Sequence, residues 1–102
     1  MMSQVTRLVG HRFEQVYDTG VTYLISFECE RTLRWEVVTG PDAGRSAIAL
    51  YDNVRIAPNV YFITWLEEDG TVVSQIADYN QMIVYTSLAC DGNLILLKGI
   101  VN

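Results

Sequence analysis

Hydrophobic and polar residues alternate along most of the chain, in short runs separated by turn residues. Val21, Tyr23, Ile25 and Phe27, for example, occupy every second position of one run. A period of two is typical of a β-strand whose two faces meet different surroundings, and no stretch of ten or more residues has the spacing of an amphipathic helix. The runs predict eight strands, at residues 12–17, 21–28, 33–38, 45–56, 60–67, 71–78, 81–88 and 93–101.

The breaks between these runs contain the residues that turns require. Gly, Asn and Asp recur there, as in Asp18-Thr19-Gly20 and Glu68-Asp69-Gly70. Short strands separated by such regularly spaced turns are typical of an all-β barrel or sandwich, and an up-and-down meander removes its free edges by closing. We therefore predict an all-β fold, a single up-and-down barrel of roughly eight strands, as one domain over residues 1–102. The run at 45–56 is either one long strand or two short ones, with a bulge or bend at Asp52-Asn53.

The alternation also predicts which side chains face the interior of the barrel. Phe13, Gln15 and Tyr17 share one face of the first strand, whereas Arg12 and Glu14 mark the other as the solvent face. An interior Gln15 beside Tyr17 is more polar than a purely structural core requires. An eight-stranded barrel has room for packed side chains or for one small ligand, so this polarity is a first indication of a site.

The strand at 60–67 leaves two orientations open. One face carries Tyr61, Ile63, Trp65 and Glu67, and the other carries Val60, Phe62, Thr64 and Leu66. If the Trp65 face points inward, the Glu67 carboxylate lies at the mouth of the barrel beside an indole. The same parities would place four apolar residues on the outer surface: Leu24, Val38, Leu66 and Leu88.

The composition excludes several classes of protein. Of the 102 residues, 50% are hydrophobic and 19% are charged, and the formal net charge is −5. Such a chain is not disordered, and it has no apolar stretch near the ~18–20 residues of a membrane-spanning helix. The seven Lys and Arg residues are scattered, whereas nucleic-acid binding needs them clustered. We expect no nucleic-acid or membrane partner, and we expect a homodimer because small symmetric dimers are common.

Histidine and cysteine are too few for a metal centre. The chain has one histidine, His11, and two cysteines, Cys29 and Cys90, which form no CxxC pair. We therefore expect no metal and no cofactor. The first residues lack an apolar run of signal-peptide length, so we expect a cytoplasmic protein with two free thiols.

Several short motifs, collinear over roughly residues 8–88, carry a resemblance to a known family. They are Gly10-His11-Arg12-Phe13, Tyr17-Asp18-Thr19-Gly20 with Tyr23, Thr39-Gly40 followed by Ala43-Gly44-Arg45, and Asn59-Val60-Tyr61-Phe62-Ile63-Thr64-Trp65-Leu66-Glu67 with Gly70-Thr71 and Val73-Ser74. In this order and spacing the chain resembles bacterial phenolic acid decarboxylases. It is also similar to the small MoaF-like proteins, which share the same barrel and fit more closely in length. The resemblance implies a calycin-type, lipocalin-like barrel with a site for a small molecule.

The resemblance also implies roles for particular side chains. The decarboxylases use two tyrosines on the first strand, an arginine after Ala-Gly and a glutamate after a tryptophan. Here Tyr17, Arg45 and Glu67 match and are the catalytic candidates, whereas Gln15 stands at the position of the other tyrosine. The chain also stops soon after the last predicted strand, where the decarboxylases continue. The candidate ligand-binding residues are Gln15, Tyr23, Trp35, Trp65 and Val73.

Decarboxylation of a hydroxycinnamic acid needs an anchor for the carboxylate and a proton donor to the alkene carbon. In this interpretation Tyr17 and Arg45 hold the substrate and Glu67 transfers protons. Because Gln15 cannot act as a phenol, three alternatives stay open. The protein is a cofactor-free lyase acting on a small aromatic or unsaturated carboxylic acid, a non-catalytic binder such as an accessory protein of the molybdenum-cofactor pathway, or a self-associating barrel. Arg45 and Glu67 could also form a structural ion pair across the barrel.

Overall fold

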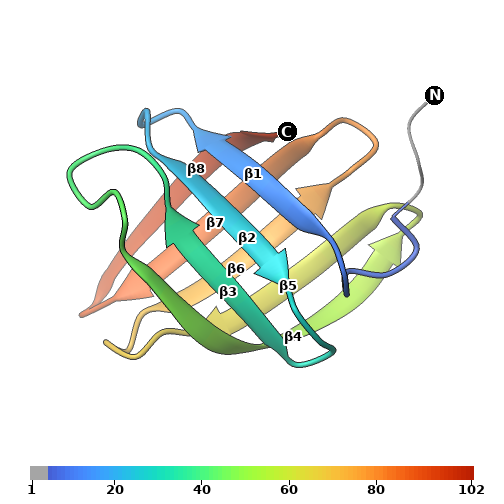
Figure 1. Ribbon diagram of the computed structural model, residues 1–102, viewed down its shortest axis with the longest axis horizontal. Helices are drawn as coiled ribbons and strands as arrows, with labels where there is room; N and C mark the ends of the chain where they lie inside the picture. The colour runs from blue at the N-terminus through green and yellow to red at the C-terminus, as the bar shows by residue number, and fades with distance from the viewer. Residues whose placement is uncertain (1–4) are drawn as a thin grey trace.

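The computed structural model describes residues 5–102, and its eight strands follow one another in chain order. They are β1 (Arg12–Tyr17), β2 (Thr22–Phe27), β3 (Thr32–Val37), β4 (Ser46–Ala57), β5 (Val60–Leu66), β6 (Val72–Asp78), β7 (Ile83–Cys90) and β8 (Asn93–Val101). Each strand pairs antiparallel with the next, and β8 pairs with β1, so the sheet closes into a barrel (Figure 1). The predicted all-β, up-and-down barrel of eight strands is confirmed.

The predicted bounds of β1 and β8 are confirmed, and the other strands differ from the sequence pattern by one or two residues at one or both ends. The clearest case is β7, which begins at Ile83 instead of residue 81. The Asp78 carboxylate accepts hydrogen bonds from the backbone N–H groups of Asn80 and Gln81, at 2.9 and 3.2 Å. This capped turn holds Gln81 outside the strand, so the strand starts two residues later.

The predicted bulge at Asp52-Asn53 is wrong. β4 is one strand of 12 residues, whose first half pairs with β3 and whose second half pairs with β5. Asp52 and Asn53 pair regularly with β5, and the register shifts instead between Arg55 and Ala57. The irregularity falls there because the strand is about to enter the turn at Pro58, which has no N–H to donate to a ladder.

Aromatic side chains and the N-terminal segment fill one end of the barrel. The rings of Phe13 and Tyr79 stack at 4.4 Å, and Val5 and Leu8 are buried against them. The Tyr61 hydroxyl donates to the Val5 carbonyl at 2.8 Å, which holds the segment in place. Figure 1 shows the N-terminal segment at this end and the β3–β4 loop at the opposite end. The barrel interior is therefore filled by side chains at this end.

Burial settles the orientations that the sequence left open. Tyr61, Ile63 and Trp65 are buried, whereas Phe62 and Leu66 are exposed, so the Trp65 face of β5 points inward. Val38 and Leu66 lie on the outside, as predicted, and Leu24 is half-buried. The outward prediction for Leu88 is wrong: it shares the inner face of β7 with Val84 and Thr86, because every second residue of a strand points the same way.

Candidate functional site

A cavity of about 230 Å³ occupies the barrel interior and opens at the end opposite the N-terminal segment. Its walls come from the inward faces of the strands, and its mouth comes from the turns at the open end. All eight residues predicted as catalytic or ligand-binding line it: Gln15, Tyr17, Tyr23, Trp35, Arg45, Trp65, Glu67 and Val73. They therefore converge on one cavity, while their roles in binding and catalysis stay predictions.

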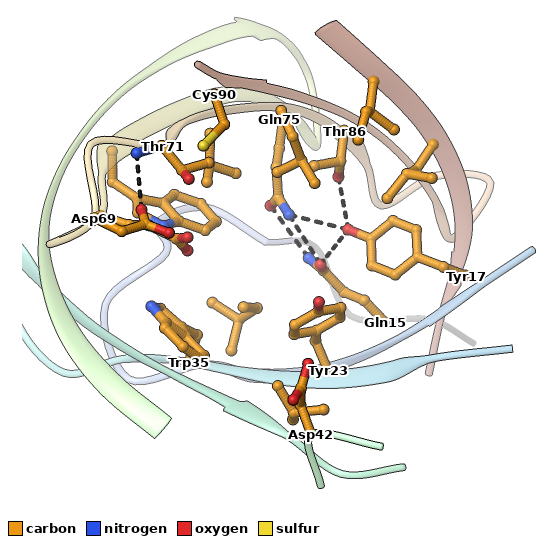
Figure 2. A pocket seen from close by; sticks show the side chains of 18 of the residues that line it. Gln15, Tyr17, Tyr23, Trp35, Asp42, Asp69, Thr71, Gln75, Thr86 and Cys90 are labelled. Atoms are coloured by element: carbon orange, nitrogen blue, oxygen red, sulfur yellow. Dashed lines mark hydrogen bonds between the residues drawn. The ribbon is translucent and has the colours of Figure 1, made fainter. Parts of the chain in front are cut away.

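The floor of the cavity is a cluster of four uncharged polar side chains, from β1, β6 and β7 (Figure 2). The Tyr17 hydroxyl donates to Gln15 Oε1 at 2.7 Å and lies 2.6 Å from Thr86 Oγ1. Gln75 Nε2 donates to Gln15 Oε1 at 2.9 Å and to the Tyr17 hydroxyl at 3.1 Å. Gln15 Nε2 donates back to Gln75 Oε1 at 3.2 Å. We call these four residues the polar floor.

The polar floor is almost completely removed from solvent. Gln15 is 1% exposed, Gln75 2%, Thr86 3% and Tyr17 5%. Burial strongly raises the pKa of the Tyr17 hydroxyl, so at neutral pH it keeps its proton and can donate it. Buried polar groups cost free energy unless they are hydrogen-bonded, and here each one has a partner within the cluster.

These hydrogen bonds do not use all the donors and acceptors of the two amide groups in the polar floor. An amide has two N–H donors and an oxygen with two lone pairs. Gln75 Nε2 uses both of its donors, and Gln15 Oε1 accepts twice. Within the part of the chain that the structure describes, one N–H of Gln15 and one lone pair of Gln75 Oε1 remain free. In Figure 2 these two atoms lie on the side of the cluster away from the Tyr17 ring.

Aromatic rings form much of the cavity wall above this floor. Trp35 comes from β3 and Trp65 from β5, and Tyr23 from β2 contacts the Tyr17 ring edge-on, with centroids 5.8 Å apart. Val73 pairs with Trp65 across the β5–β6 ladder and adds an aliphatic surface. A small flat molecule would meet π-faces and methyl groups on its sides and polar atoms only below.

The mouth of the cavity carries most of its charge. Trp65 Nε1 donates to Glu67 Oε2 at 3.3 Å, yet half-burial of this carboxyl raises its pKa above the ordinary value. Asp69 has a lowered pKa because its carboxylate accepts a hydrogen bond from the Thr71 backbone, at 2.9 Å. Asp42 is the third carboxylate of the lining. The mouth is therefore predominantly acidic.

Arg45 is the single cation among the residues that line the cavity. Its guanidinium lies 3.9 Å from Asp42, three residues earlier, and both side chains are 66% exposed. The suggested Arg45–Glu67 ion pair is not formed between these described residues; the β3–β4 loop brings Asp42 closer to Arg45 instead. Arg45 is therefore a loop residue at the rim of the cavity.

Sequence reasoning missed four lining residues that shape the site: Asp42, Asp69, Gln75 and Thr86. Gln75 carried a usable signal, because it interrupts the apolar inward series of Val73 and Ala77 just as Gln15 interrupts the series of the first strand. The loop positions of Asp42 and Asp69 follow no alternation, so no such signal existed for them.

Residues 5–102 form neither a metal centre nor a membrane-spanning helix. Within this range no group of three or more His, Cys, Asp or Glu side chains is arranged to hold a metal ion. The same residues include no helix of the length and apolarity needed to cross a membrane.

Comparison with known proteins gives a family and a structural relative. The family model described as MoaF-like matches residues 9–102. A crystal structure of a protein from Burkholderia vietnamiensis, named a "putative beta-lactamase", superposes with a TM-score of 0.86 at 30% sequence identity, covering 93% of each chain. No curated protein matches the sequence.

Proposed function

The chain belongs to the MoaF-like family, and we propose that it binds one small, uncharged, ring-bearing molecule in the barrel cavity. The observation that carries this proposal is the polar floor. A barrel core that serves only stability is best made of apolar side chains, because a buried polar group costs free energy unless it forms a hydrogen bond. Here a buried cluster of amides and hydroxyls lies beneath aromatic walls, at the bottom of a cavity that opens to solvent.

The cavity volume limits the size of the ligand. An apolar cavity of about 150 Å³ accommodates benzene. The cavity here measures about 230 Å³, which corresponds to one six-membered ring with a short substituent. Trp35, Trp65 and Tyr23 would contact the faces and edges of that ring, as aromatic pairs do at centroid distances of about 4.5–7 Å.

The free groups of the polar floor favour a particular substituent. Gln15 has an unused N–H donor, and Gln75 Oε1 has an unused lone pair. A carboxamide or a lactam presents an acceptor and a donor side by side and would complete both. Ligand and floor would then exchange two hydrogen bonds, each worth about 0.5–1.5 kcal/mol net.

The charges at the mouth disfavour an anionic ligand. Asp42, Glu67 and Asp69 line the entrance, and Arg45 is already close to Asp42. The buried floor holds no cation that could receive a carboxylate, and an unpaired buried charge is costly. A neutral carboxamide avoids both penalties, so it should bind more tightly than the carboxylate of the same ring.

A calorimetric and thermal-shift series tests this proposal with benzamide, benzoate and toluene, which share one ring and differ in the substituent. Benzamide should raise the unfolding temperature most, since a ligand at about a hundred times its Kd adds about 2.7 kcal/mol of stability. Gln75→Met should weaken benzamide binding, while the exposed control Gln81→Met should not. If no compound binds, the proposed site fails; if benzoate binds as well as benzamide, only the ligand class fails.

The raised pKa of Glu67 favours a second candidate, a cofactor-free lyase. A carboxyl group whose pKa is raised by burial keeps its proton to a higher pH than an exposed one, which suits it to general acid catalysis. In decarboxylation of p-coumaric acid, the bond to the carboxylate breaks, CO₂ leaves, and Glu67 protonates the alkene carbon. Tyr17 and Arg45, which line the same cavity, would orient the substrate.

Loss of the ultraviolet absorbance of p-coumaric acid measures this reaction directly. Glu67→Gln should abolish it, while Glu68→Gln, an exposed neighbour in the turn, should not. Absence of turnover by the folded wild-type protein would remove the lyase and leave the binding proposal intact.

We do not propose for this cavity the activity that the name of the Burkholderia vietnamiensis relative states. Hydrolysis of a β-lactam requires an activated nucleophile, such as a serine with a base, or a metal-bound water. Within residues 5–102 the cavity lining includes neither serine nor histidine, and no metal-ligating group of three side chains occurs.

The cytoplasm stays our proposed location, because Cys29 and Cys90 are free thiols, as is usual in a reducing compartment.

A further inference from the structure

The outer surface of β5–β8 is almost free of charge. In a chain that is 19% charged, these four strands contain only Asp78 and Lys98 as charged residues. The outward positions are instead apolar or small and polar. Depletion of charge together with enrichment in aromatic residues is the compositional mark of the core of a protein–protein interface.

Apolar side chains form a continuous row across four neighbouring strands. The strand register pairs Val54 with Phe62, Phe62 with Ile76, and Ile76 with Tyr85. All four point outward, and they are 52%, 41%, 43% and 43% exposed. Because neighbouring strands lie about 4.8 Å apart, directly paired side chains touch and form one ridge.

A second row runs parallel to the first, nearer the open end of the barrel. Leu66 pairs with Val72, Val72 with Ala89, and Ala89 with Leu94. Leu66 and Leu94 are 62% and 75% exposed. Small polar residues such as Ser74 and Ser87 separate the two rows, so no charged side chain lies between them. We call the two rows the apolar face.

The area of the apolar face exceeds what a monomer usually leaves in water. The seven large apolar side chains of the two rows each present on the order of 100 Å², and Ala89 adds little, so the two rows present roughly 700 Å². The largest apolar patch of a typical monomer is about 300–600 Å². A stable dimer buries about 800 Å² on each partner, and the two rows together with Thr64, Ser74 and Ser87 between them present about that area.

We propose that the apolar face is the interface of a symmetric homodimer. The closed barrel has no free strand edge, so two copies can associate through a sheet face but not by adding a strand. The strands that carry the face, β4 to β8, hold two acids, Asp52 and Asp78, and two bases, Arg55 and Lys98, so two copies meet without net charge repulsion. In a twofold arrangement each ridge packs against the same ridge of the partner, and Phe62 and Tyr85 supply aromatic anchors.

Sedimentation velocity of the full chain over a dilution series tests the interface, with two variants of matched exposure. Ile76→Arg places a cation in the middle of the apolar face, whereas Val38→Arg changes an apolar residue outside it that is 41% exposed. The wild type and Val38→Arg should sediment as dimers. Ile76→Arg should weaken the dimer by about a hundredfold, because both copies bring the charge into the interface.

A measurement on the wild type makes the test independent of how the variants fold. Methyl NMR signals of Ile76 and Leu94 should shift on dilution, while that of Ile25, which is buried inside the barrel, should not. A wild type that stays monomeric at every concentration overturns the proposal. So does a dimer that Ile76→Arg leaves intact, or one whose dilution shifts lie outside the apolar face.

Discussion

Replacing Tyr17 with Phe removes one hydroxyl from the polar floor and breaks all of its bonds there. Gln15 Oε1 loses a donor at 2.7 Å, Gln75 Nε2 loses an acceptor at 3.1 Å, and Thr86 loses its partner at 2.6 Å. A buried polar group without a partner costs about 1–3 kcal/mol. Two donors, on Gln75 and Thr86, are left unsatisfied, but water from the adjoining cavity can reach them. Two such groups would together cost about 2–6 kcal/mol. We therefore expect Tyr17→Phe to lower the free energy of unfolding by about 2–3 kcal/mol, near the lower end of that range.

Urea unfolding of the wild type and of four variants measures this loss. Thr86→Val breaks only the bond to Tyr17 and should cost about 1 kcal/mol. The double variant should cost less than the two single variants together, because Thr86 no longer has a donor to satisfy. Thr6→Val is the control: Thr6 is exposed and lies outside the apolar face, so removal of its hydroxyl should change the free energy of unfolding by less than about 0.5 kcal/mol.

Two results would refute the reasoning about the polar floor. A loss below about 0.5 kcal/mol for Tyr17→Phe would mean that the hydroxyl contributes no more than a surface group. Strict additivity of Tyr17→Phe and Thr86→Val would mean that the two hydroxyls do not interact, despite their distance of 2.6 Å. Either result would remove the network as the basis for the proposed ligand site.

Three further predictions concern single positions. Gly99→Ala should destabilise the barrel by about 1–3 kcal/mol in urea unfolding, because the added Cβ would lie 3.0 Å from the Tyr17 ring and 3.1 Å from Val84; an unchanged midpoint would contradict that close approach. Burial raises the pKa of Glu67 in the folded protein above the unfolded pKa, which is near 4.5. The contribution of this group to the free energy of unfolding is therefore complete below the unfolded pKa and is lost as the pH rises through the folded pKa. Glu67→Gln should therefore raise the unfolding temperature relative to the wild type at pH 8 but not at pH 4, and a constant difference would argue against the shift. The Tyr79 hydroxyl is buried and has no hydrogen-bond partner among the described residues, so Tyr79→Phe should leave stability unchanged or increase it by up to about 1 kcal/mol; a clear loss in calorimetry would show that a partner exists.

The fold was predictable because each strand carries its own evidence of which face is buried. An alternation such as that of Tyr23, Ile25 and Phe27 can be recognised without knowledge of the neighbouring strands. The alternating runs together predicted the right number and order of strands. The bulge in β4 was not predictable in the same way. Asp52-Asn53 has the composition of a bulge or bend, but both residues pair in regular register with β5, and that pairing is a tertiary contact.

The site was predictable only in part, for a related reason. Gln15 and Tyr17 lie on one strand, so their common face follows from their spacing. Gln75 joins Gln15 across 60 residues of sequence, and that contact exists only because the barrel closes. The ion pair of Arg45 depends on the path of the β3–β4 loop, which has no period, and the loop selects Asp42 over the more distant Glu67.

Neighbouring residues on β5 and β6 belong to two different surfaces, and this fixes the strand register. Trp65 and Gln75 face the cavity, while Leu66 and Ile76 face outward. A slip of one residue would exchange the two sets, because side chains alternate with a period of two. Gln75 would then lose its buried partner Gln15, and the apolar face would be interrupted by polar groups. The same strand register is therefore required on the inside for the cavity and on the outside for the apolar face. A substitution that shifts the register to favour one surface would disrupt the other.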